Sequence, residues 1–327
     1  MISNTRRSFS ITKFILLSVI FVKFGLSDQV IASQSIVLKN SRARIQEIKN
    51  QGQKHLWERI RNNFNINPKQ TKIAGQPKIQ KYVKQYSREE KHLNKISNQA
   101  IPYLYYIVEQ LEKRNMPGEL ALLPMLESAF QPQATSNKGA AGIWQFMPAT
   151  GRMHGLKQDA FYDGRRDIKA STKAALDYLE FLHKEFDGNW MLALAAYNAG
   201  PGAVHRAIKR NKRAGKSINF WDLKLPKETQ EYVPKFLALA AVIDNPEKHD
   251  ISLPFIGNQP YFKPVNPGKH LNFIQAAKLA DVDIKELKRL NPGFRKAHTH
   301  PKGPQEILLP VVNAKKFEYN LGKSTRQ

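Results

Sequence analysis

The sequence predicts a mainly α-helical protein that ends in a small βααβ unit. Between Ile101 and Asn245, apolar residues recur at helical spacing and Gly and Pro separate the periods, whereas alternating apolar and polar residues are scarce. After a Pro-rich break at Leu253–Pro267, two short helical patterns are flanked by strand patterns. The chain has 327 residues, 41% of them hydrophobic, so it can bury a core of the size that such a domain needs.

Residues 1–32 have the pattern of a secretory signal peptide. Basic residues such as Arg6 and Lys13 precede the uncharged run Phe14–Val22, and Val30-Ile31-Ala32 offers small residues for cleavage. A membrane anchor is the alternative, but the run is short, because a spanning helix needs about 20 apolar residues. We therefore expect export, and a location in the periplasm or cell envelope.

The charge balance favours a polyanionic partner. There are 52 Lys+Arg against 27 Asp+Glu, a formal net charge of +25, which attracts nucleic acid, anionic membrane or an acidic cell wall. An exported protein meets the cell envelope rather than nucleic acid. We therefore expect peripheral association with anionic envelope surfaces and no nucleic-acid partner. The basic run His205–Lys216 lacks interleaved aromatic residues and is expected to be a solvated loop.

Several classes of chemistry are excluded by residue type. The chain has no cysteine, which excludes disulfides, thiolate metal sites, a cysteine nucleophile and the acylated cysteine of a lipoprotein. No phosphate-binding Gly-rich motif occurs, and the nine histidines show no H-E-x-x-H grouping. The sequence therefore predicts no cofactor and no metal, and it leaves the oligomeric state open.

The rest of the chain divides into three parts. Residues 33–100 are polar and very basic, with a helical stretch near Ser41–Asn62, and are predicted to form a basic helical N-terminal extension. Residues 101–250 are predicted to form the main helical domain, and residues 255–327 the C-terminal unit. Helices of the main domain are expected at Pro102–Asn115, Gly118–Ala129, Ile168–Phe186, Trp190–Asn198, Gly202–Lys209 and Pro226–Ile243.

Glu127 is the candidate catalytic group. It is the one charged residue between Leu120 and Asn137, and Leu120, Leu123 and Phe130 share its face of the expected helix. An apolar environment desolvates the charged form of a carboxyl group and raises its pKa. A general acid that works near neutral pH needs such a shift, so the residues alone nominate Glu127 as an acid.

Four motifs then give the chain a family resemblance. These are Glu127-Ser128, Gly142-Ile143-Trp144-Gln145, Ala196-Tyr197-Asn198-Ala199-Gly200, and Glu228-Thr229 with Tyr232-Val233. Their order and spacing resemble those of the soluble lytic transglycosylase domain, which is similar to goose lysozyme. The resemblance runs from about Leu56 to the end of the chain. It implies a lysozyme-like helical domain that cleaves peptidoglycan glycan strands.

The resemblance also implies a mechanism with one carboxylate. Glu127 matches the acid that protonates the oxygen between N-acetylmuramic acid and N-acetylglucosamine, and then takes a proton from the muramoyl C6 hydroxyl. That hydroxyl attacks C1 of its own ring and leaves a 1,6-anhydro end, with the high effective molarity of an intramolecular nucleophile. Ordinary glycosidases use a pair of carboxylates, and no motif-matched aspartate is found here. A hydrolytic muramidase and a non-catalytic wall-binding protein are the alternatives.

The same motifs imply a set of substrate-binding residues, each with a plainer explanation. Ser136 could be a turn residue, Gln145 a polar neighbour of a core tryptophan, and Glu228 a charge that stabilises a helix N-terminus. Tyr197, which matches the tyrosine that positions the catalytic carboxyl group, could be a contact at a helix end. The full set is Ser136, Gln145, Met147, Tyr197, Asn198, Glu228 and Tyr232, of which Met147 and Tyr232 could be core residues. Gly142 is expected to permit a tight backbone approach.

The C-terminal unit is similar to a LysM module, a small βααβ fold that binds N-acetylglucosamine chains. Ile274, Ala277, Ile284, Leu287 and Leu290 supply the helical faces, and Ile307-Leu-Leu-Pro310 the second strand. Asn266-Pro-Gly-Lys-His270 replaces the usual G-D-T opening, and the middle loop is long. Glycan binding and a structural role are therefore both open for this unit.

Overall fold

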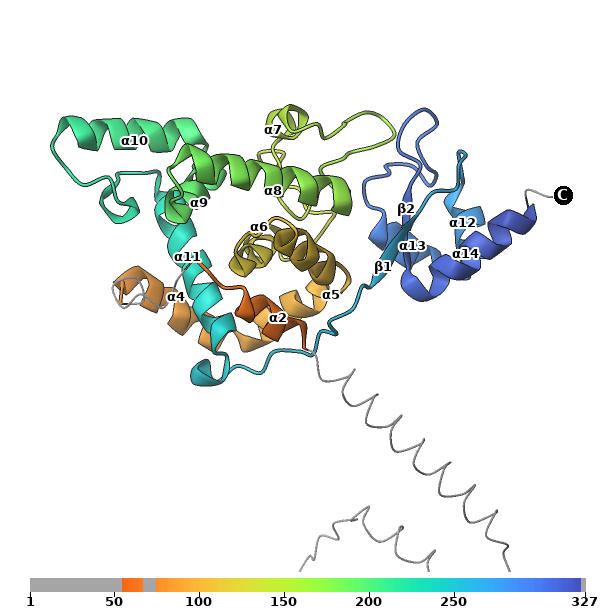
Figure 1. Ribbon diagram of the computed structural model, residues 1–327, viewed down its shortest axis with the longest axis horizontal. Coiled ribbons are helices and arrows are strands. Elements are labelled where there is room, and N and C mark those ends of the chain that lie inside the picture. The colour runs from red at the N-terminus through yellow and green to blue at the C-terminus, as the bar shows by residue number, and fades with distance from the viewer. Residues whose placement is uncertain (1–54, 67–74, 325–327) are drawn as a thin grey trace, which may run out of the picture. The chain divides into compact units, whose positions relative to one another are not determined.

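Helices make up most of the chain that the computed structural model describes, namely residues 55–66 and 75–324 (Figure 1). The mainly helical class is confirmed. The predicted signal peptide and most of the predicted N-terminal extension lie outside the described residues. The elements before the C-terminal unit are α2 (Leu56–Asn62), α4 (Pro77–Arg88), α5 (Glu90–Glu112), η2 (Gly118–Leu122), α6 (Leu123–Ser128), α7 (Pro148–Met153), α8 (Ile168–Glu185), α9 (Trp190–Ala199), α10 (Pro201–Arg213), η3 (Phe220–Asp222), α11 (Lys227–Asp244) and η4 (Glu247–His249).

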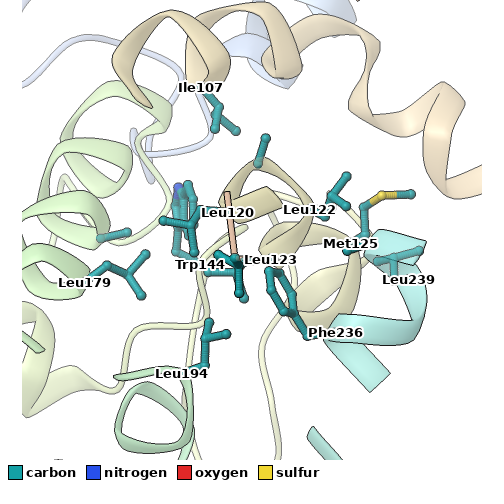
Figure 2. Close-up of a cluster of buried hydrophobic side chains, with 14 of the residues drawn as sticks. Ile107, Leu120, Leu122, Leu123, Met125, Trp144, Leu179, Leu194, Phe236 and Leu239 are labelled. Carbon is teal, nitrogen blue, oxygen red and sulfur yellow. The ribbon is translucent and has the colours of Figure 1, made fainter. Parts of the chain in front are cut away.

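The core surrounds the segment that leads to Glu127. Leu120, Leu122 and Leu123 of η2 and α6 are completely buried. Side chains of α5, α8, α9 and α11 close around them, as Figure 2 shows for Ile107, Leu179, Leu194 and Phe236. A segment that is apolar on every side is stable only when it is enclosed, which explains why this stretch lies at the centre.

This central segment is not the single α-helix predicted for Gly118–Ala129. It begins as a 3₁₀ helix and continues as the short α6, which has Pro124 in its first turn. Proline has no backbone N–H to donate and is well tolerated in the first turn of a helix, which fits the start of α6 at this point. The segment ends at Ala129 and Phe130, whose φ angles are 51° and 55°. This tight reversal turns the chain away directly after Glu127.

The helix predicted to begin at Pro102 begins at Glu90, so the predicted boundary at residues 100–101 falls inside α5. Leu93, Ile96 and Ala100 are buried and continue the apolar stripe of the later turns. α4 likewise buries one face and packs against α11. Residues 77–100 thus belong to the main helical core. Their helices were not predicted because a narrow apolar stripe is hard to see in a segment that is basic overall.

Other helix predictions are confirmed within a few residues, and α10 is longer than predicted. It runs to Arg213, through most of the basic run that was expected to be a solvated loop. Val204, Ala207 and Asn211 are buried at helical spacing, which holds this segment on the core while its basic side chains face outward. None of the helices in the described ranges is long and apolar enough to cross a bilayer.

The C-terminal unit has the predicted βααβ order and one further helix. It comprises β1 (Phe262–Val265), α12 (Phe273–Ala280), α13 (Ile284–Leu290), β2 (Ile307–Pro310) and α14 (Val311–Ser324). The two strands are antiparallel, with Phe262 opposite Pro310 and Val265 opposite Ile307. α14 was not predicted; it buries Ala314 and Phe317 against α12 and the strands.

The Pro-rich stretch before this unit is attached to the start of the helical core. The backbone N–H of Leu56 donates to the carbonyl of Ile256 at 2.9 Å. The indole Nε1 of the buried Trp57 donates to the carbonyl of Pro254 at 3.1 Å. The connection is therefore fixed along the surface of α2.

Candidate active site

One cleft of about 870 Å³ brings together all the residues that the sequence nominates for catalysis and substrate binding. This volume is within the range of small-molecule sites, about 300–1,000 Å³. The cleft is lined from α4, α5, α6, the segment between α6 and α7, α9 and α11. The nominated residues that line it are Glu127, Ser136, Gln145, Met147, Tyr197, Asn198, Glu228 and Tyr232.

Glu127 is half-buried in the wall of this cleft, near the end of α6. The pKa of its carboxyl group is raised to about 7. Burial is the main cause, a hydrogen bond from Tyr232 opposes it, and the charge of Glu228 adds a smaller rise. The direction predicted from the sequence is confirmed, although the predicted neighbours are different. Leu120, Leu123 and Phe130 are buried in the core, whereas the cleft around the carboxyl group is formed largely by other helices.

The hydroxyl of Tyr232, on α11, donates to Oε1 of Glu127 at 2.5 Å. Burial and the negative charge of Glu127 hold the pKa of the Tyr232 hydroxyl well above its ordinary value, so the phenol keeps its proton. Tyr197 was expected to hold the carboxyl group, but its hydroxyl donates to the backbone carbonyl of Trp144 at 2.9 Å. The positioning contact thus comes from Tyr232, for which the sequence is consistent with either a cleft residue or a core residue.

Residues 132–147, which we call the cleft loop, carry Ser136, Gln145 and Met147. Gln145 has a φ angle of 49°, an uncommon conformation for a residue with a side chain. Its Nε2 donates to the carbonyl of Gly142 at 2.8 Å, which fixes the amide at the cleft wall. Met147 lies at the rim and is 41% exposed.

Gly142 has a structural reason to be glycine. Its φ angle is 84°, and a Cβ at this position would lie 1.9 Å from the carbonyl oxygen of Arg165. The predicted tight backbone approach is confirmed, and the partner is the protein's own chain. The loop is therefore pressed against residue 165 at this point.

Ser136 closes a turn within the cleft loop. Its Oγ accepts a hydrogen bond from the backbone N–H of Ala140 at 3.0 Å, and its own N–H donates to the carbonyl of Ala140 at 2.9 Å. The turn explanation is thus correct for its local contacts, and the residue also lines the cleft.

α9 and α11 are joined at the opposite wall. Asn198 accepts a hydrogen bond at Oδ1 from the hydroxyl of Thr229 at 2.7 Å. The adjacent Glu228 points outward, with a side chain 74% exposed and Nζ of Lys138 4.0 Å away. The cleft therefore has a polar rim on this side.

Three carboxylates line the cleft: Glu127, Glu228 and Glu89. Glu228 and Glu89 are exposed, so water solvates their charges. Glu127 alone among the three is held in an environment that favours the neutral acid. Within residues 55–66 and 75–324, no three His, Asp or Glu side chains are grouped so that they could hold a metal ion.

One wall of the cleft was missed by the sequence interpretation. Tyr86 of α4 and His92 of α5 line it, as do Tyr82, Gln85, Glu89, Leu93 and Ile96. These residues lie in the segment that was assigned to a basic extension. The buried positions Ile79, Tyr82 and Val83 have the spacing of a helix face, and this was the signal that could have found them.

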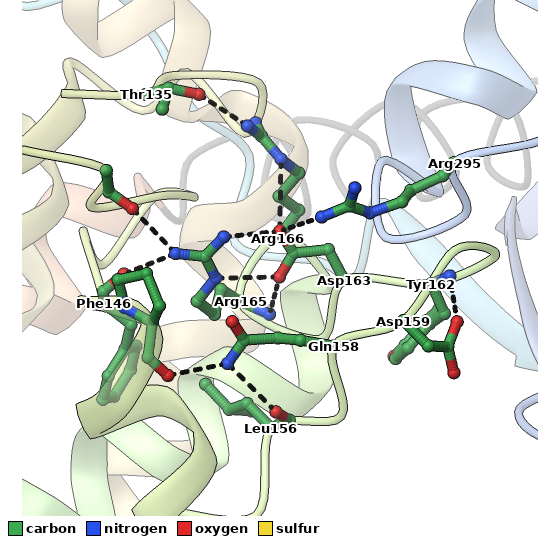
Figure 3. A network of polar contacts seen from close by, with 12 residues as sticks. Thr135, Phe146, Leu156, Gln158, Asp159, Tyr162, Asp163, Arg165, Arg166 and Arg295 are labelled. Carbon is green, nitrogen blue, oxygen red and sulfur yellow. Dashed lines mark hydrogen bonds and ion pairs between the residues drawn. The ribbon is translucent and has the colours of Figure 1, made fainter. Parts of the chain in front are cut away.

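A buried ion-pair network lies behind the cleft loop (Figure 3). Arg165 donates from Nε and Nη2 to the two carboxylate oxygens of Asp163, at 2.9 and 2.8 Å. Its Nη1 donates to the carbonyl of Gly139 at 2.8 Å and to that of Phe146 at 3.3 Å. This network was not predicted, because Gly139 and Phe146 are distant in sequence from Asp163 and Arg165 and meet them only in the folded protein.

Comparison with known proteins identifies two domains in this chain. The family model for the transglycosylase SLT domain matches residues 105–220. The family model for the LysM-like domain of lytic transglycosylase MltD matches residues 261–325. These matches cover the α5–α10 region and the C-terminal unit.

The chain is similar to several known proteins. It is 43% identical over 249 residues to membrane-bound lytic murein transglycosylase D of Escherichia coli (strain K12). The matched region covers 76% of this chain and 55% of that protein. It is also 43% identical over 164 residues to a protein of Alteromonas sp. (strain M-1) named for tributyltin chloride resistance, covering 50% of this chain and 77% of that protein.

A solved structure is similar as well. The X-ray structure of an inactive mutant of lytic transglycosylase Slt from Pseudomonas aeruginosa is 29% identical, with a TM-score of 0.35, and the match covers 45% of this chain and 24% of that one. The chain spans about half the length of the E. coli relative. With an SLT domain followed by an MltD-type LysM-like domain, the chain belongs to the lytic murein transglycosylase family.

Proposed function

We propose that this protein is a peptidoglycan lytic transglycosylase. It cleaves the β-1,4 bond between N-acetylmuramic acid and N-acetylglucosamine and leaves 1,6-anhydro ends. The observation that carries this proposal is the state of Glu127, a carboxyl group with a pKa raised to about 7 inside a cleft of about 870 Å³. Such a group is protonated often enough near neutral pH to act as an acid, and its conjugate base is then available.

The reaction requires Glu127 to donate one proton and then to accept another. The Glu127 carboxyl group gives its proton to the glycosidic oxygen as the bond to C1 breaks. The muramoyl C6 hydroxyl then forms the new bond to C1 and gives its proton to the Glu127 carboxylate, which restores the acid. Tyr232 fixes the carboxyl group in both steps through its hydrogen bond to Oε1 at 2.5 Å, and by stabilising the charged form it favours release of the proton in the first step.

The remaining nominated residues hold the glycan strand in this proposal. Gln145 and Ser136 face the sugar from the cleft loop, with Met147 at the rim. Asn198 and Glu228 bind from the opposite wall, and Glu228 is placed on the acetamido group of the substrate. The fixed amide of Gln145 and the Asn198–Thr229 hydrogen bond support these roles, since both side chains are held before substrate arrives.

The location of the reaction is part of the proposal. Residues 1–32 export the chain to the periplasm or cell envelope, and they lie outside the described residues. The E. coli relative is named as membrane-bound, which supports an envelope location here. Residues 255–327 form a LysM-like unit, and the basic surface of the protein favours peripheral contact with anionic envelope components.

The product of digestion tests the proposal. Mass spectrometry of soluble muropeptides from purified peptidoglycan should show anhydro ends, which are lighter than reducing ends by one water. Glu127→Gln should abolish release while the protein still sediments with peptidoglycan. Glu247→Gln, which changes an exposed glutamate outside the cleft, should cleave normally. A majority of reducing ends would identify a hydrolytic muramidase instead, and full activity of Glu127→Gln would refute the acid assignment.

A further inference from the structure

The cleft loop is held from behind by two neighbouring arginines. Arg165 binds the carbonyls of Gly139 and Phe146, at 2.8 and 3.3 Å. Arg166 donates from Nη2 to the hydroxyl of Thr135 at 2.6 Å, at the start of the same loop (Figure 3). The position of the loop, and of the side chains it places in the cleft, therefore depends on where these guanidinium groups are fixed.

Both arginines are fixed by one carboxylate. The side chain of Asp163 is 1% exposed; Arg165 binds both of its oxygens, and Nε of Arg166 lies 3.8 Å from Oδ2. Burial would raise the pKa of Asp163, but the hydrogen bonds and charge of Arg165 and the charge of Arg295 hold it below its ordinary value. Asp163 is thus a buried anion whose geometry is set by its cationic partners.

The C-terminal unit closes the remaining side of this carboxylate. Nη2 of Arg295 lies 3.3 Å from Oδ2 of Asp163. The carbonyl of Gly293 accepts the backbone N–H of Asp163 at 2.8 Å, and the backbone N–H of Arg295 donates to the carbonyl of Phe161 at 2.8 Å. The loop between α13 and β2 thus runs beside residues 161–163 and covers Asp163.

The contact is tightly packed. The rings of Tyr162 and Phe294 meet edge to face with centroids 5.4 Å apart. A Cβ on Gly293 would lie 2.9 Å from Cε2 of Tyr162 and 3.1 Å from Cβ of Asp167. There is no room for a side chain at residue 293, so this loop approaches the helical domain as closely as its backbone allows.

We propose that the C-terminal unit is a positioning element of the cleft, which acts through Asp163 as the positioning residue. By enclosing Asp163 it keeps Arg165 and Arg166 in place, and these hold the cleft loop in the form that binds glycan. The inference rests on the proposed function for its link to glycan binding. Precise placement of binding groups depends on such supporting contacts, because a displacement of about 1 Å in a site can cost about a hundredfold in rate.

Two variants of the full chain test this proposal. Gly293→Ala inserts a methyl group between the unit and Tyr162, and Arg295→Gln removes the outer charge from Asp163 without adding bulk. Arg289→Gln is the matched control, because its guanidinium pairs with Glu286 inside the C-terminal unit and does not touch Asp163. Arg295→Lys keeps the charge and should restore part of what Arg295→Gln loses.

Hydrogen exchange followed by mass spectrometry provides the decisive measurement. In the free protein, peptides from residues 132–147 should exchange about threefold faster or more in Gly293→Ala, and also faster in Arg295→Gln, with no change in Arg289→Gln. With glycan strands, KM should rise about tenfold in Gly293→Ala, while the pH profile set by Glu127 stays in place. If the melting temperature falls but exchange of residues 132–147 and KM do not change, the unit is only a stabilising attachment and the proposal is overturned.

The two proposals can fail separately. Exchange is measured without substrate, so it tests the coupling even if the protein releases no anhydro products. If Gly293→Ala does not fold, Arg295→Gln decides, since its side chain is 47% exposed and peripheral. Normal exchange and normal KM in Arg295→Gln would then overturn the inference while leaving the transglycosylase proposal intact.

Discussion

Tyr232 and Glu127 are 105 positions apart in the chain, yet the hydroxyl of Tyr232 lies 2.5 Å from Oε1 of Glu127. The two residues come from α11 and α6, which meet at the cleft. Burial raises the pKa of the carboxyl group and this hydrogen bond lowers it, so the value of about 7 is a balance between the two. The predictions that follow depend on that balance and on the contacts that hold the cleft loop.

Tyr232→Phe should move the pH dependence of the reaction. Removing the hydrogen bond removes a contact that stabilises the charged carboxylate, so the pKa of Glu127 rises. The fall of kcat/KM on the basic side should move to higher pH, and the maximal rate should drop by about tenfold or more because the carboxyl group is less well fixed. Rates measured from pH 5 to 9 test this.

The matched control is Tyr197→Phe, which also removes one buried phenolic hydroxyl. That hydroxyl binds the carbonyl of Trp144 instead of Glu127, so its loss should slow the reaction without moving the basic limb of the profile. Equal shifts in the two variants would show that the hydrogen bond from Tyr232 does not control the acid.

Glu127→Gln should be more stable than the wild type at alkaline pH. The folded-state pKa of about 7 is above the ordinary value, so the fold favours the neutral acid. The stability that the neutral Glu127 side chain contributes to the wild type is fully present below its unfolded pKa, near 4.3. This contribution is lost as the pH rises through about 7. Urea titrations should show a difference in the free energy of unfolding that grows by on the order of 2 kcal/mol from pH 5 to pH 8. A difference that does not change with pH would contradict the burial of a neutral acid.

Gly142→Ala should be strongly destabilising. The new Cβ would lie 1.9 Å from the carbonyl oxygen of Arg165, and the φ angle of 84° is unfavourable for alanine. We expect a loss of on the order of 3 kcal/mol or more in the free energy of unfolding. Gly155→Ala is the control, since φ is 75° but no atom lies within 4 Å of the added carbon; it should cost about 1–2 kcal/mol. Similar losses in both would show that backbone strain, and not the contact with Arg165, makes residue 142 glycine.

Asp163→Asn should destabilise the protein at neutral pH and matter less in acid. The pKa of Asp163 is held below its ordinary value in the fold, so the stability it contributes is present above the unfolded pKa of about 3.9 and is lost as pH falls through the folded value. Breaking a buried ion pair costs about 3–5 kcal/mol. Urea titrations of the wild type and the variant test this at pH 7 and below pH 4. The two free energies of unfolding should differ at pH 7 and converge at low pH. An equal difference at the two pH values would exclude the charge of Asp163 as the cause.

Sequence patterns located the helices whose apolar faces are uninterrupted. α8 and α11 were predicted almost to the residue, because Asp167 caps α8 and Pro226 precedes α11. α4 and the first half of α5 were missed, because abundant Lys and Gln on their outer faces conceal a narrow apolar stripe. α14 was missed for a similar reason, since Ala314 and Phe317 alone are completely buried among its residues 311–323.

Residues of the candidate site could be predicted where a local sequence motif identifies them. Contacts between residues that are distant in sequence could not. Glu127 was identified from its lone charge in an apolar stretch. The family resemblance assigned the contact with the carboxyl group to Tyr197, whereas Tyr232 makes it, because which hydroxyl reaches the carboxyl group depends on how α9 and α11 meet α6. The same holds for Asp163 and Arg295, which lie 132 positions apart and meet only in the folded protein.

The attachment of residues 254–256 to α2 has a consequence for the mobility of the C-terminal unit. Leu56 and Trp57 hold this connection at 2.9 and 3.1 Å, and the loop after α13 holds the other side. The C-terminal unit is therefore attached to the helical domain at two separate places, and a swing of the unit about a single hinge would break one of these two sets of contacts.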